Sequence, residues 1–471
     1  MIRPIENLLY KLKIRTSSGI FCNGGMALKC MEKSSYEKKM RLLVYIETEF
    51  LKYTEKSSLQ IIEKIQREKV KRILKSAMHV PYWSNYVYAL SSLSRKIKSI
   101  KEIEQLPIVT RKDIQNNFSK GRLTNKNIPT QRRVLSFTSG STGEPLQFFL
   151  DTIIAAGRRA RYQRMVQWFA REKDFIAIRA LGTPPFGFKT LKNVLFVKID
   201  SRKMGDVYFS YFCRHLRNIQ RLYQKRIIVD MFPSNVMRLA PLLRRSGVDV
   251  SRILGFVSGG ESLLPGERAY IKKELACDIW GHYASTEFEI IAQECGYSPT
   301  HSYHINSEYF YIEIVDKDGA ILSAGKTGRI IITSLEHEVT PFLRYDTGDM
   351  GRLLKEQCPC GKTLPLILVE GRCANLIHLP EGKTLTQFSI LNIFYNIQLV
   401  NLVRQFQLIH EKPDVMTVKI VPHYSSSKKS LDVVRKKLEE VVGNKIKISV
   451  VTVDAIPAGK NGKRLGYISK F

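Results

Sequence analysis

Hydrophobic residues between positions 37 and 79 recur every three or four places, which is the spacing of one face of an α-helix. The pattern predicts a helical lead-in over residues 1–70 that continues to about residue 79. Residues 106–113 then read as an extended stretch that turns into a helix, with Thr110 as the capping residue.

The middle of the chain alternates short apolar runs with longer amphipathic stretches. Such runs are typical of buried strands, and the longer stretches are typical of helices. This alternation predicts an α/β core with parallel strands. The expected strands cover residues 176–178, 194–197, 227–229 and 253–257, and the expected helices cover 158–171, 211–223 and 234–245.

Near residue 305 the pattern changes to antiparallel β-structure, with strands at 309–315 and 328–333 and a tight turn at 316–319. After Arg372 the pattern predicts a small α+β domain. We therefore expect a large N-terminal body at 1–372 and a small mobile C-terminal domain at 373–471. The elements expected in the small domain are strands 403–409, 414–421 and 446–453 and a helix at 431–442.

Composition changes this picture only through charge. Hydrophobic residues make up 44% of the 471 positions and charged residues 25%, which is ordinary for a globular protein and excludes a disordered or coiled-coil chain. The net charge is +32, with +24 on residues 1–372 and +8 on residues 373–471. Because the excess forms no basic tail, we expect no nucleic-acid partner. Peripheral association with an anionic membrane stays open.

The sequence also bears on the compartment. It contains no apolar run of about 18 residues, and charges interrupt residues 1–13 too often for a secretory signal. Those residues fit a helix packed on its own domain, or an amphipathic helix resting on a membrane surface. The eight cysteines are too few for a disulfide scaffold in a chain this long. We expect a cytoplasmic protein, with the inner membrane face as the alternative.

A loop rich in Gly, Ser and Thr is the strongest local signal. It runs over residues 135–145 and follows an apolar strand end. Glycines let backbone N–H groups converge on an anion, and hydroxyls add donors, so the loop suits a triphosphate. It lacks the Gly-Lys-Ser/Thr of a Walker loop. A plain surface linker is the alternative interpretation.

Two further segments favour nucleotide chemistry. Residues 283–287 follow a strand-like stretch, and there Glu287 could hold Mg²⁺ while Thr286 binds phosphate. Residues 344–349 place Asp349 after a glycine turn, which suits a grip on ribose hydroxyls. The acyl pocket is expected from the segments around Phe137, 232–234 and 257–260, and to be mostly apolar.

In this order and at these intervals, the three segments resemble the adenylate-forming superfamily, in particular its phenylacetate–CoA ligase-like branch found among capsular polysaccharide biosynthesis proteins. The resemblance covers roughly residues 70–471. It implies a large adenylation body of mixed parallel and antiparallel sheets and a small C-terminal lid. It also implies binding roles for Thr138, Ser139, Gly140, Ser141, Thr142 and Gly143 at the ATP phosphates, Gly259, Gly260, Glu261 and Tyr283 at the adenine, Ser285 and Thr286 at the α-phosphate, Glu287 at Mg²⁺, and Asp349 and Arg372 at the ribose.

The same resemblance identifies Lys463 as the mobile lysine that reaches the carboxylate and α-phosphate; Lys460 is the other candidate. The implied reaction joins a small-molecule carboxylate to AMP with release of pyrophosphate. Acyl transfer to CoA, a carrier thiol or an amine follows. Ala374 and Asn375 depart from the family's hinge pattern, so the alternative is a catalytically degenerate nucleotide-binding or scaffold protein of the same fold.

Cysteine spacing raises one more possibility. Cys358 and Cys360 form a compact pair, and Cys295 and the histidines His301 and His304 lie earlier in the chain. From spacing alone, a tetrahedral zinc site and buried inert thiols both remain open. The resemblance favours structural Zn²⁺ held by Cys295, His304, Cys358 and Cys360, with His304 preferred because it directly precedes a strand.

Overall fold

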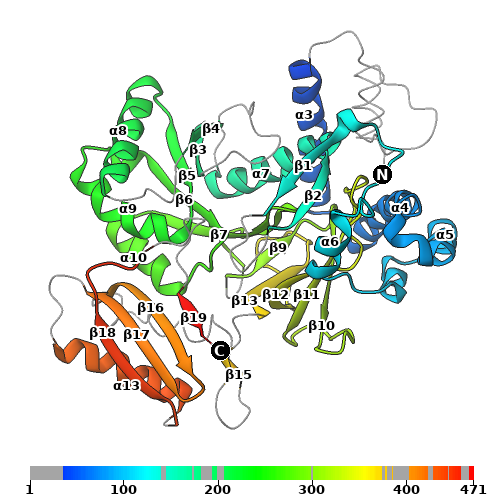
Figure 1. The fold of residues 1–471 in the computed structure, drawn as a ribbon. Helices are drawn as coiled ribbons and strands as arrows, with labels where there is room; N and C mark the ends of the chain where they lie inside the picture. The colour runs from blue at the N-terminus through cyan, green and yellow to red at the C-terminus, as the bar shows by residue number, and fades with distance from the viewer. Residues whose placement is uncertain are drawn as a thin grey trace.

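The computed structural model confirms a mixed α/β protein with separate large and small sheets (Figure 1). It describes residues 36–138, 145–171, 174–181, 194–198, 206–298, 301–373, 377–378, 384–385, 403–422, 428–443, 445–457 and 466–470. The predicted N-terminal helix lies outside these residues. So do the loop residues Ser139, Gly140, Ser141, Thr142 and Gly143, the hinge positions Ala374 and Asn375, and both candidate lysines, Lys460 and Lys463.

From residue 36 onward, where the structure describes it, the lead-in is helical as its periodicity predicts. Helices α3 (Tyr36–Thr54), α4 (Leu59–Ala77) and α5 (Val87–Lys96) precede α6 (Arg111–Phe118). In α4 the buried apolar positions follow the helical period and pack into the largest core. Thr110 caps α6 as predicted: its side chain accepts a hydrogen bond from the Asp113 backbone, while the Asp113 side chain accepts one from the Thr110 backbone. No helix among the described residues is long and apolar enough to cross a membrane.

The large sheet has eleven strands, and one half of it is parallel. Alternate residues of its strands enter two different cores. Ile176 and Ile178 pack with helices on one face, whereas Ala177 packs with α7 on the other. The parallel strands are β3 (Phe175–Leu181), β4 (Val194–Lys198), β5 (Arg226–Asp230), β6 (Ile253–Gly259) and β7 (Asp278–Ser285), and the helices are α7 (Ala155–Ala170), α8 (Asp206–Leu222), α9 (Pro233–Arg245) and α10 (Pro265–Leu275).

The other half of the large sheet is antiparallel, as predicted. Its strands are β8 (Glu289–Gln293), β9 (Tyr303–Ile305), β10 (Phe310–Val315), β11 (Gly328–Ser334), β12 (Tyr345–Leu353) and β13 (Leu366–Arg372). The turn after β10 forms, with Gly319 at φ 90°, but it does not lead straight into β11. Instead Ile321 pairs back on Val315, and β11 begins only at Gly328.

Among the described residues, three smaller sheets accompany the large one. A hairpin of β1 (Arg133–Phe137) and β2 (Gln147–Asp151) flanks the predicted phosphate loop, and β14 (Ile377–His378) pairs with β15 (Thr384–Leu385). The C-terminal sheet has the order β18-β17-β16-β19 and is covered by α13 (Lys428–Val442). Its strands are β16 (Val403–Lys412), β17 (Val415–Pro422), β18 (Lys447–Thr452) and β19 (Tyr467–Ser469).

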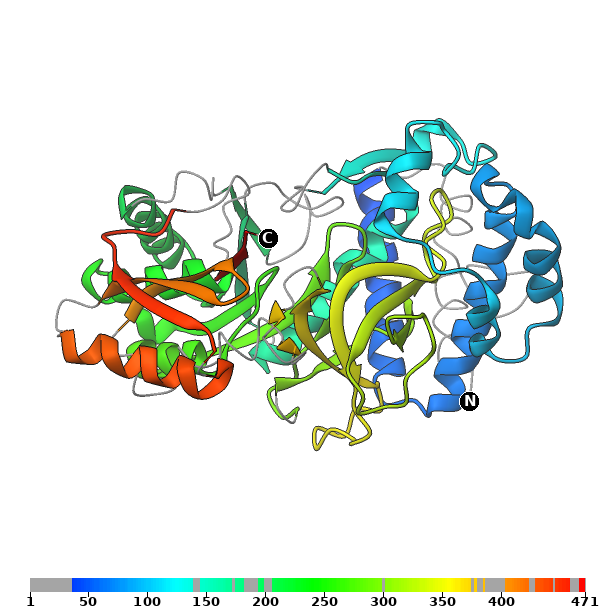
Figure 2. The same ribbon diagram turned by 60° about the horizontal axis from the view of Figure 1, so that its bottom comes forward.

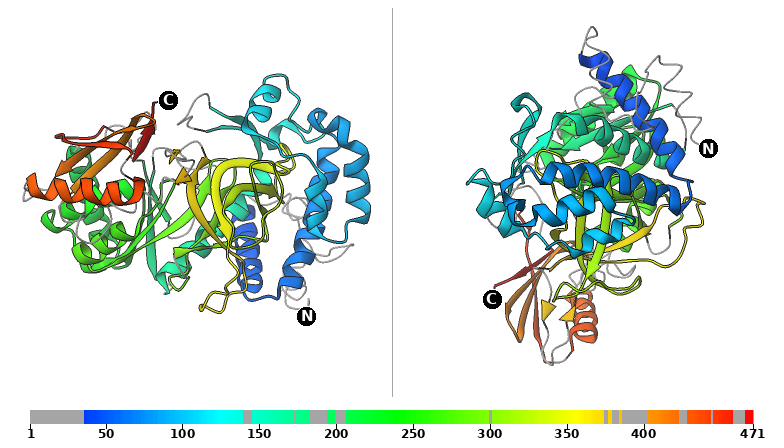
Figure 3. Two further views of the ribbon diagram at one scale, coloured as in Figure 1. Left: turned by 90° about the horizontal axis from the view of Figure 1, so that it is seen from below. Right: turned by 90° about the vertical axis from the view of Figure 1, so that its right-hand side faces the viewer.

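The C-terminal sheet lies next to the parallel half of the large sheet, at the opposite end of the molecule from α4 and α5 (Figures 2 and 3). Its core packs around Leu408, Val418 and Leu438, and Leu264 of the large body joins that core. The boundary after Arg372 remains a prediction, although β13 of the large sheet ends at that residue.

Candidate functional site

The predicted nucleotide residues gather around the carboxyl ends of β6 and β7. These neighbouring parallel strands pair Gly259 with His282. A Cβ atom at Gly259 would stand only 2.4 Å from Nε2 of His282, so the two strands require glycine there. Gly260 has a φ of 79°, in the left-handed region that glycine adopts without strain. Ligands of α/β sheets commonly bind at this edge.

Tyr283, Asp349 and Arg372 form one hydrogen-bonded group there. The Tyr283 hydroxyl donates to Oδ2 of Asp349 at 2.6 Å, and Nε of Arg372 lies 2.9 Å from Oδ1. Burial, followed by the Asp349 charge, raises the pKa of Tyr283 well above its usual value, so its hydroxyl stays a donor. The Asp349 charge raises the pKa of Arg372. In the sequence, Tyr283 lies 66 positions before Asp349 and 89 positions before Arg372.

Glu287 sits in the short turn between β7 and β8 and is buried. The Tyr345 hydroxyl donates to its Oε1 at 3.3 Å. Ser285 Oγ accepts a hydrogen bond from the Phe288 backbone at 3.2 Å, which closes the turn, while Thr286 is exposed at its tip. A carboxylate is a hard oxygen ligand of the kind Mg²⁺ prefers, so the chemistry of Glu287 fits the predicted role.

Thr138 stands at the start of the predicted phosphate loop. Its Oγ1 accepts hydrogen bonds from Nη2 of Arg111 at 3.0 Å and from the Leu146 backbone at 2.9 Å. The side chain thus closes the neck of the loop. Arg111 begins α6 and was missed as a site residue, although the charge of Arg111 also acts on Tyr345, the partner of Glu287.

Glu261 forms two hydrogen bonds with Ser234. Its carboxylate accepts hydrogen bonds from the backbone and hydroxyl of Ser234, both at 3.1 Å. It therefore ties the end of β6 to the first turn of α9. Of the predicted site residues, Tyr283 and Arg372 both contact Asp349. Glu287 lies in the turn that directly follows β7, the strand of Tyr283.

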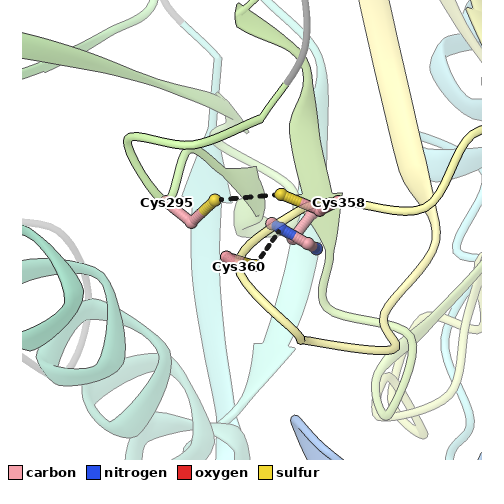
Figure 4. A group of neighbouring side chains, drawn as sticks. Cys295, Cys358 and Cys360 are labelled. Carbon is pink, nitrogen blue, oxygen red and sulfur yellow. Dashed lines mark hydrogen bonds between the residues drawn. The ribbon is translucent and has the colours of Figure 1, made fainter.

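The cysteine–histidine group is compact. The possible ligand atoms of Cys295, His304, Cys358 and Cys360 all lie within 4.8 Å of one another. The Cys295 and Cys358 sulfurs are 3.4 Å apart, and the Cys360 sulfur is 3.4 Å from Nε2 of His304. Figure 4 shows the three cysteines meeting from two separate segments. Zinc with Zn–S bonds of about 2.3 Å would hold tetrahedral sulfurs roughly 3.8 Å apart, so the cluster has the size of a zinc site.

The tautomer and charge state of His304 both suit a metal ligand. Nδ1 of His304 lies 3.0 Å from the Leu364 carbonyl, which favours a proton on Nδ1 and leaves the Nε2 lone pair facing the cysteines. Burial lowers the pKa of His304 to about 4, so the ring is neutral near pH 7. Burial also raises the pKa of Cys295 to about 12, so a bound cation is needed to hold that sulfur as a thiolate. His301 does not belong to the group.

Comparisons with known proteins show which proteins this chain resembles. Residues 377–470 match the family model described as the CapK C-terminal domain. A phenylacetate–coenzyme A ligase of Thermus thermophilus is 33% identical over 141 residues, which are 29% of this chain and 32% of that protein. A phenylacetate–coenzyme A ligase of Escherichia coli is 22% identical, with 86% of this chain and 94% of that enzyme aligned.

A solved structure extends the likeness to the fold. The 2-hydroxyisobutyryl-CoA ligase, in the postadenylation state with R3-HIB-AMP, superposes with a TM-score of 0.74 at 16% identity. The superposition covers 88% of this chain and 91% of that one. The predicted resemblance to the phenylacetate–CoA ligase-like branch of adenylate-forming enzymes is confirmed.

Proposed function

We propose that this chain, which resembles phenylacetate–CoA ligases in sequence and has the fold of an adenylate-forming enzyme, is a ligase that activates a carboxylic acid with ATP. A carboxylate oxygen would attack the α-phosphorus, and the bond to pyrophosphate would break. The products are an acyl-adenylate and pyrophosphate. The acyl group would then pass to CoA or to another thiol or amine.

The contacts of Tyr283 and Arg372 with the Asp349 carboxylate, beside the turn that carries Glu287, are the observation that supports this proposal. A pre-arranged carboxylate suits two ribose hydroxyls, because each hydroxyl can donate to one of its oxygens. The ion pair with Arg372 holds the Asp349 carboxylate in place. Glu287 would hold Mg²⁺ near the phosphates.

The remaining roles follow the family pattern. Gly259, Gly260 and Glu261 would line the adenine, and Ser285 and Thr286 would face the α-phosphate. Thr138 and the loop that follows it would clasp the phosphates, and Lys463 would reach the reacting oxyanions. Bound Mg²⁺ would offset the negative charge that accumulates as two anions meet.

We also propose that the Cys295, His304, Cys358 and Cys360 group binds a structural zinc ion. Three sulfurs and one imidazole complete four coordination positions, which is the closed arrangement of structural rather than catalytic zinc. The hydrogen bond of His304 to the Leu364 carbonyl supplies the outer contact that orients a histidine ligand.

The acceptor and pathway are less specific proposals. CoA is the acceptor named for the ligases that this chain resembles, so we propose CoA first, with a carrier thiol or an amine as alternatives. A place in surface polysaccharide biosynthesis is proposed only from the resemblance to the phenylacetate–CoA ligase-like branch found among capsular polysaccharide biosynthesis proteins. The diffuse net charge of +32 would favour work near an anionic membrane face.

Replacing Asp349 with Asn should weaken ATP binding by about 10- to 100-fold, since a charged hydrogen-bond acceptor is lost. The change also leaves the Arg372 guanidinium without its carboxylate. Isothermal titration calorimetry with ATP measures the effect. Asp346→Asn is the matched control, because Asp346 lies in the same strand but pairs with Arg329 at 2.5 Å. Equal losses in both variants would contradict the ribose role.

Exchange of radioactive pyrophosphate into ATP, over a panel of carboxylic acids, tests the proposed function. We expect exchange that depends on one class of acid and on Mg²⁺. A folded protein that binds ATP but exchanges with none of the acids would favour the degenerate nucleotide-binding alternative. Absence of both exchange and ATP binding would contradict the proposal.

A further inference from the structure

Three buried arginines hold three consecutive residues, the last two of the turn between β7 and β8 and the first of β8. Arg158 donates through Nη2 to the Glu287 carbonyl. Arg161 donates through Nη2 to the Phe288 carbonyl at 3.2 Å. Arg179 donates through Nη2 to Oε1 of Glu289 at 2.6 Å. Arg158, Arg161 and Arg179 are 1%, 0% and 4% exposed, so their guanidinium groups interact with the protein and not with solvent.

Two of the three arginines, Arg161 and Arg179, are themselves held in place by carboxylates. Arg161 forms a two-pronged ion pair with Glu336, at 3.0 and 2.8 Å, and lies over the Tyr309 ring. Nε of Arg179 lies 2.9 Å from Asp230 on the neighbouring strand β5. Two of the three arginines come from one helix, α7, and the third comes from β3. The turn is thus fixed from the helix and the sheet together.

The backbone of the turn needs such support. Ser285 pairs with Glu289, so residues 286–288 form a three-residue loop, and Glu289 follows with a φ of 61°. This left-handed conformation after a three-residue hairpin loop is one that glycine usually takes. A glutamate held there persists only where its surroundings fix it, and here the Arg179 ion pair does so.

Resting on the proposed function, we infer that Arg158, Arg161 and Arg179 are positioning residues that aim Glu287 at Mg²⁺–ATP. Their guanidinium groups bind carbonyls and a carboxylate on the buried side of the turn. The exposed side, with Thr286, is left for phosphate. Burial in the low-dielectric interior strengthens each of these hydrogen bonds, so the carboxylate of Glu287 keeps one direction when the cation arrives.

The test measures ATP binding to the full-length protein by calorimetry at a series of Mg²⁺ concentrations, together with the thermal midpoint. Arg158→Lys keeps the charge but cannot reproduce the guanidinium contact. Glu289→Gln is the milder second variant, since it weakens the tie to Arg179 and keeps the side-chain shape. Each should raise the Mg²⁺ concentration for half-maximal ATP binding by about tenfold or more.

Arg164→Lys is the matched control. Arg164 is a buried arginine of the same helix, with Nη1 2.8 Å from Oε1 of Glu308, and among the described residues it forms no hydrogen bond or ion pair with those of the turn. We expect it to lower the thermal midpoint as Arg158→Lys does, while its Mg²⁺ half-saturation stays within about twofold of the unaltered protein. A structural role alone would not separate these two effects.

Unchanged Mg²⁺ dependence in folded Arg158→Lys and Glu289→Gln proteins would overturn the inference, as would an equal shift in Arg164→Lys. If one variant fails to fold, the other decides. Should the unaltered protein bind Mg²⁺–ATP yet show no pyrophosphate exchange, the proposed function fails while the positioning role is still measured. Failure to bind Mg²⁺–ATP at all would overturn both.

Discussion

Replacing Lys463 with alanine should lower the rate of acyl-adenylate formation by about 10²- to 10³-fold, the loss typical for removing one charge-stabilising group from a transition state. ATP affinity should change far less, because the loop and Asp349 would still bind the nucleotide. Lys463 lies outside the described residues, but both flanks of its segment are anchored. The Ile456 backbone donates to Gln405 at 3.3 Å, and β19 pairs with β16.

Single-turnover rates with saturating Mg²⁺–ATP, beside calorimetric ATP affinities, check this prediction. Lys460→Ala is the control, since Lys460 is the other lysine preceded by glycine in this segment. A larger rate loss in Lys460→Ala would mean that the two lysines were assigned the wrong way round. Equal losses of rate and affinity in Lys463→Ala would mean that Lys463 binds ATP and is not the mobile lysine.

Loss of zinc should destabilise the protein strongly. A ligand present at a thousand times its dissociation constant stabilises the folded state by about 4 kcal/mol, and structural zinc binds at least that well. Purified protein should contain close to one zinc ion per chain, and Cys358→Ala should lose both the metal and this stability. Burial of Cys295 and His304 makes the apo cluster poorly solvated, which adds to the loss.

Elemental analysis and denaturant titration measure the two effects. Cys277→Ala serves as the control, because Cys277 is a buried thiol outside the cluster. It should keep the zinc and lose far less stability. Protein that was never exposed to chelator and yet contains no zinc would rule out the metal site, whatever the stability of the variants.

Much of the fold follows from local pattern. The parallel strands were predicted because both of their faces are buried, which leaves continuous apolar runs such as 227–229. Strand β19 was missed because three residues carry no readable period, and its pairing to β16 is a contact across the small domain. The start of β11 was predictable from its apolar run. The pairing of Ile321 with Val315 before β11 was not, because it is a single isolated bridge with no sequence pattern.

In the candidate site, too, residues in local motifs could be predicted, whereas residues that act through long-range contacts could not. Tyr283, Glu287 and Asp349 sit in short motifs, so they could be predicted as site residues from the sequence, and their binding roles stay predictions. Arg158 and Arg161 were not recognised because the groups they bind lie 129 and 127 positions away along the chain. These arginines also change the meaning of the net charge of +32, because part of the cationic content is internal and paired with carboxylates such as Glu336.

Mass spectrometry of the enzyme-bound product tests the central claim most directly. Full-length protein would be mixed with Mg²⁺–ATP and the acid that gives the best exchange, without CoA. We predict an acyl-adenylate at close to one per chain, formed with an equal amount of pyrophosphate and consumed when CoA or another true acceptor is added. Release of ADP and phosphate instead, with no adenylate for any acid, would contradict the account.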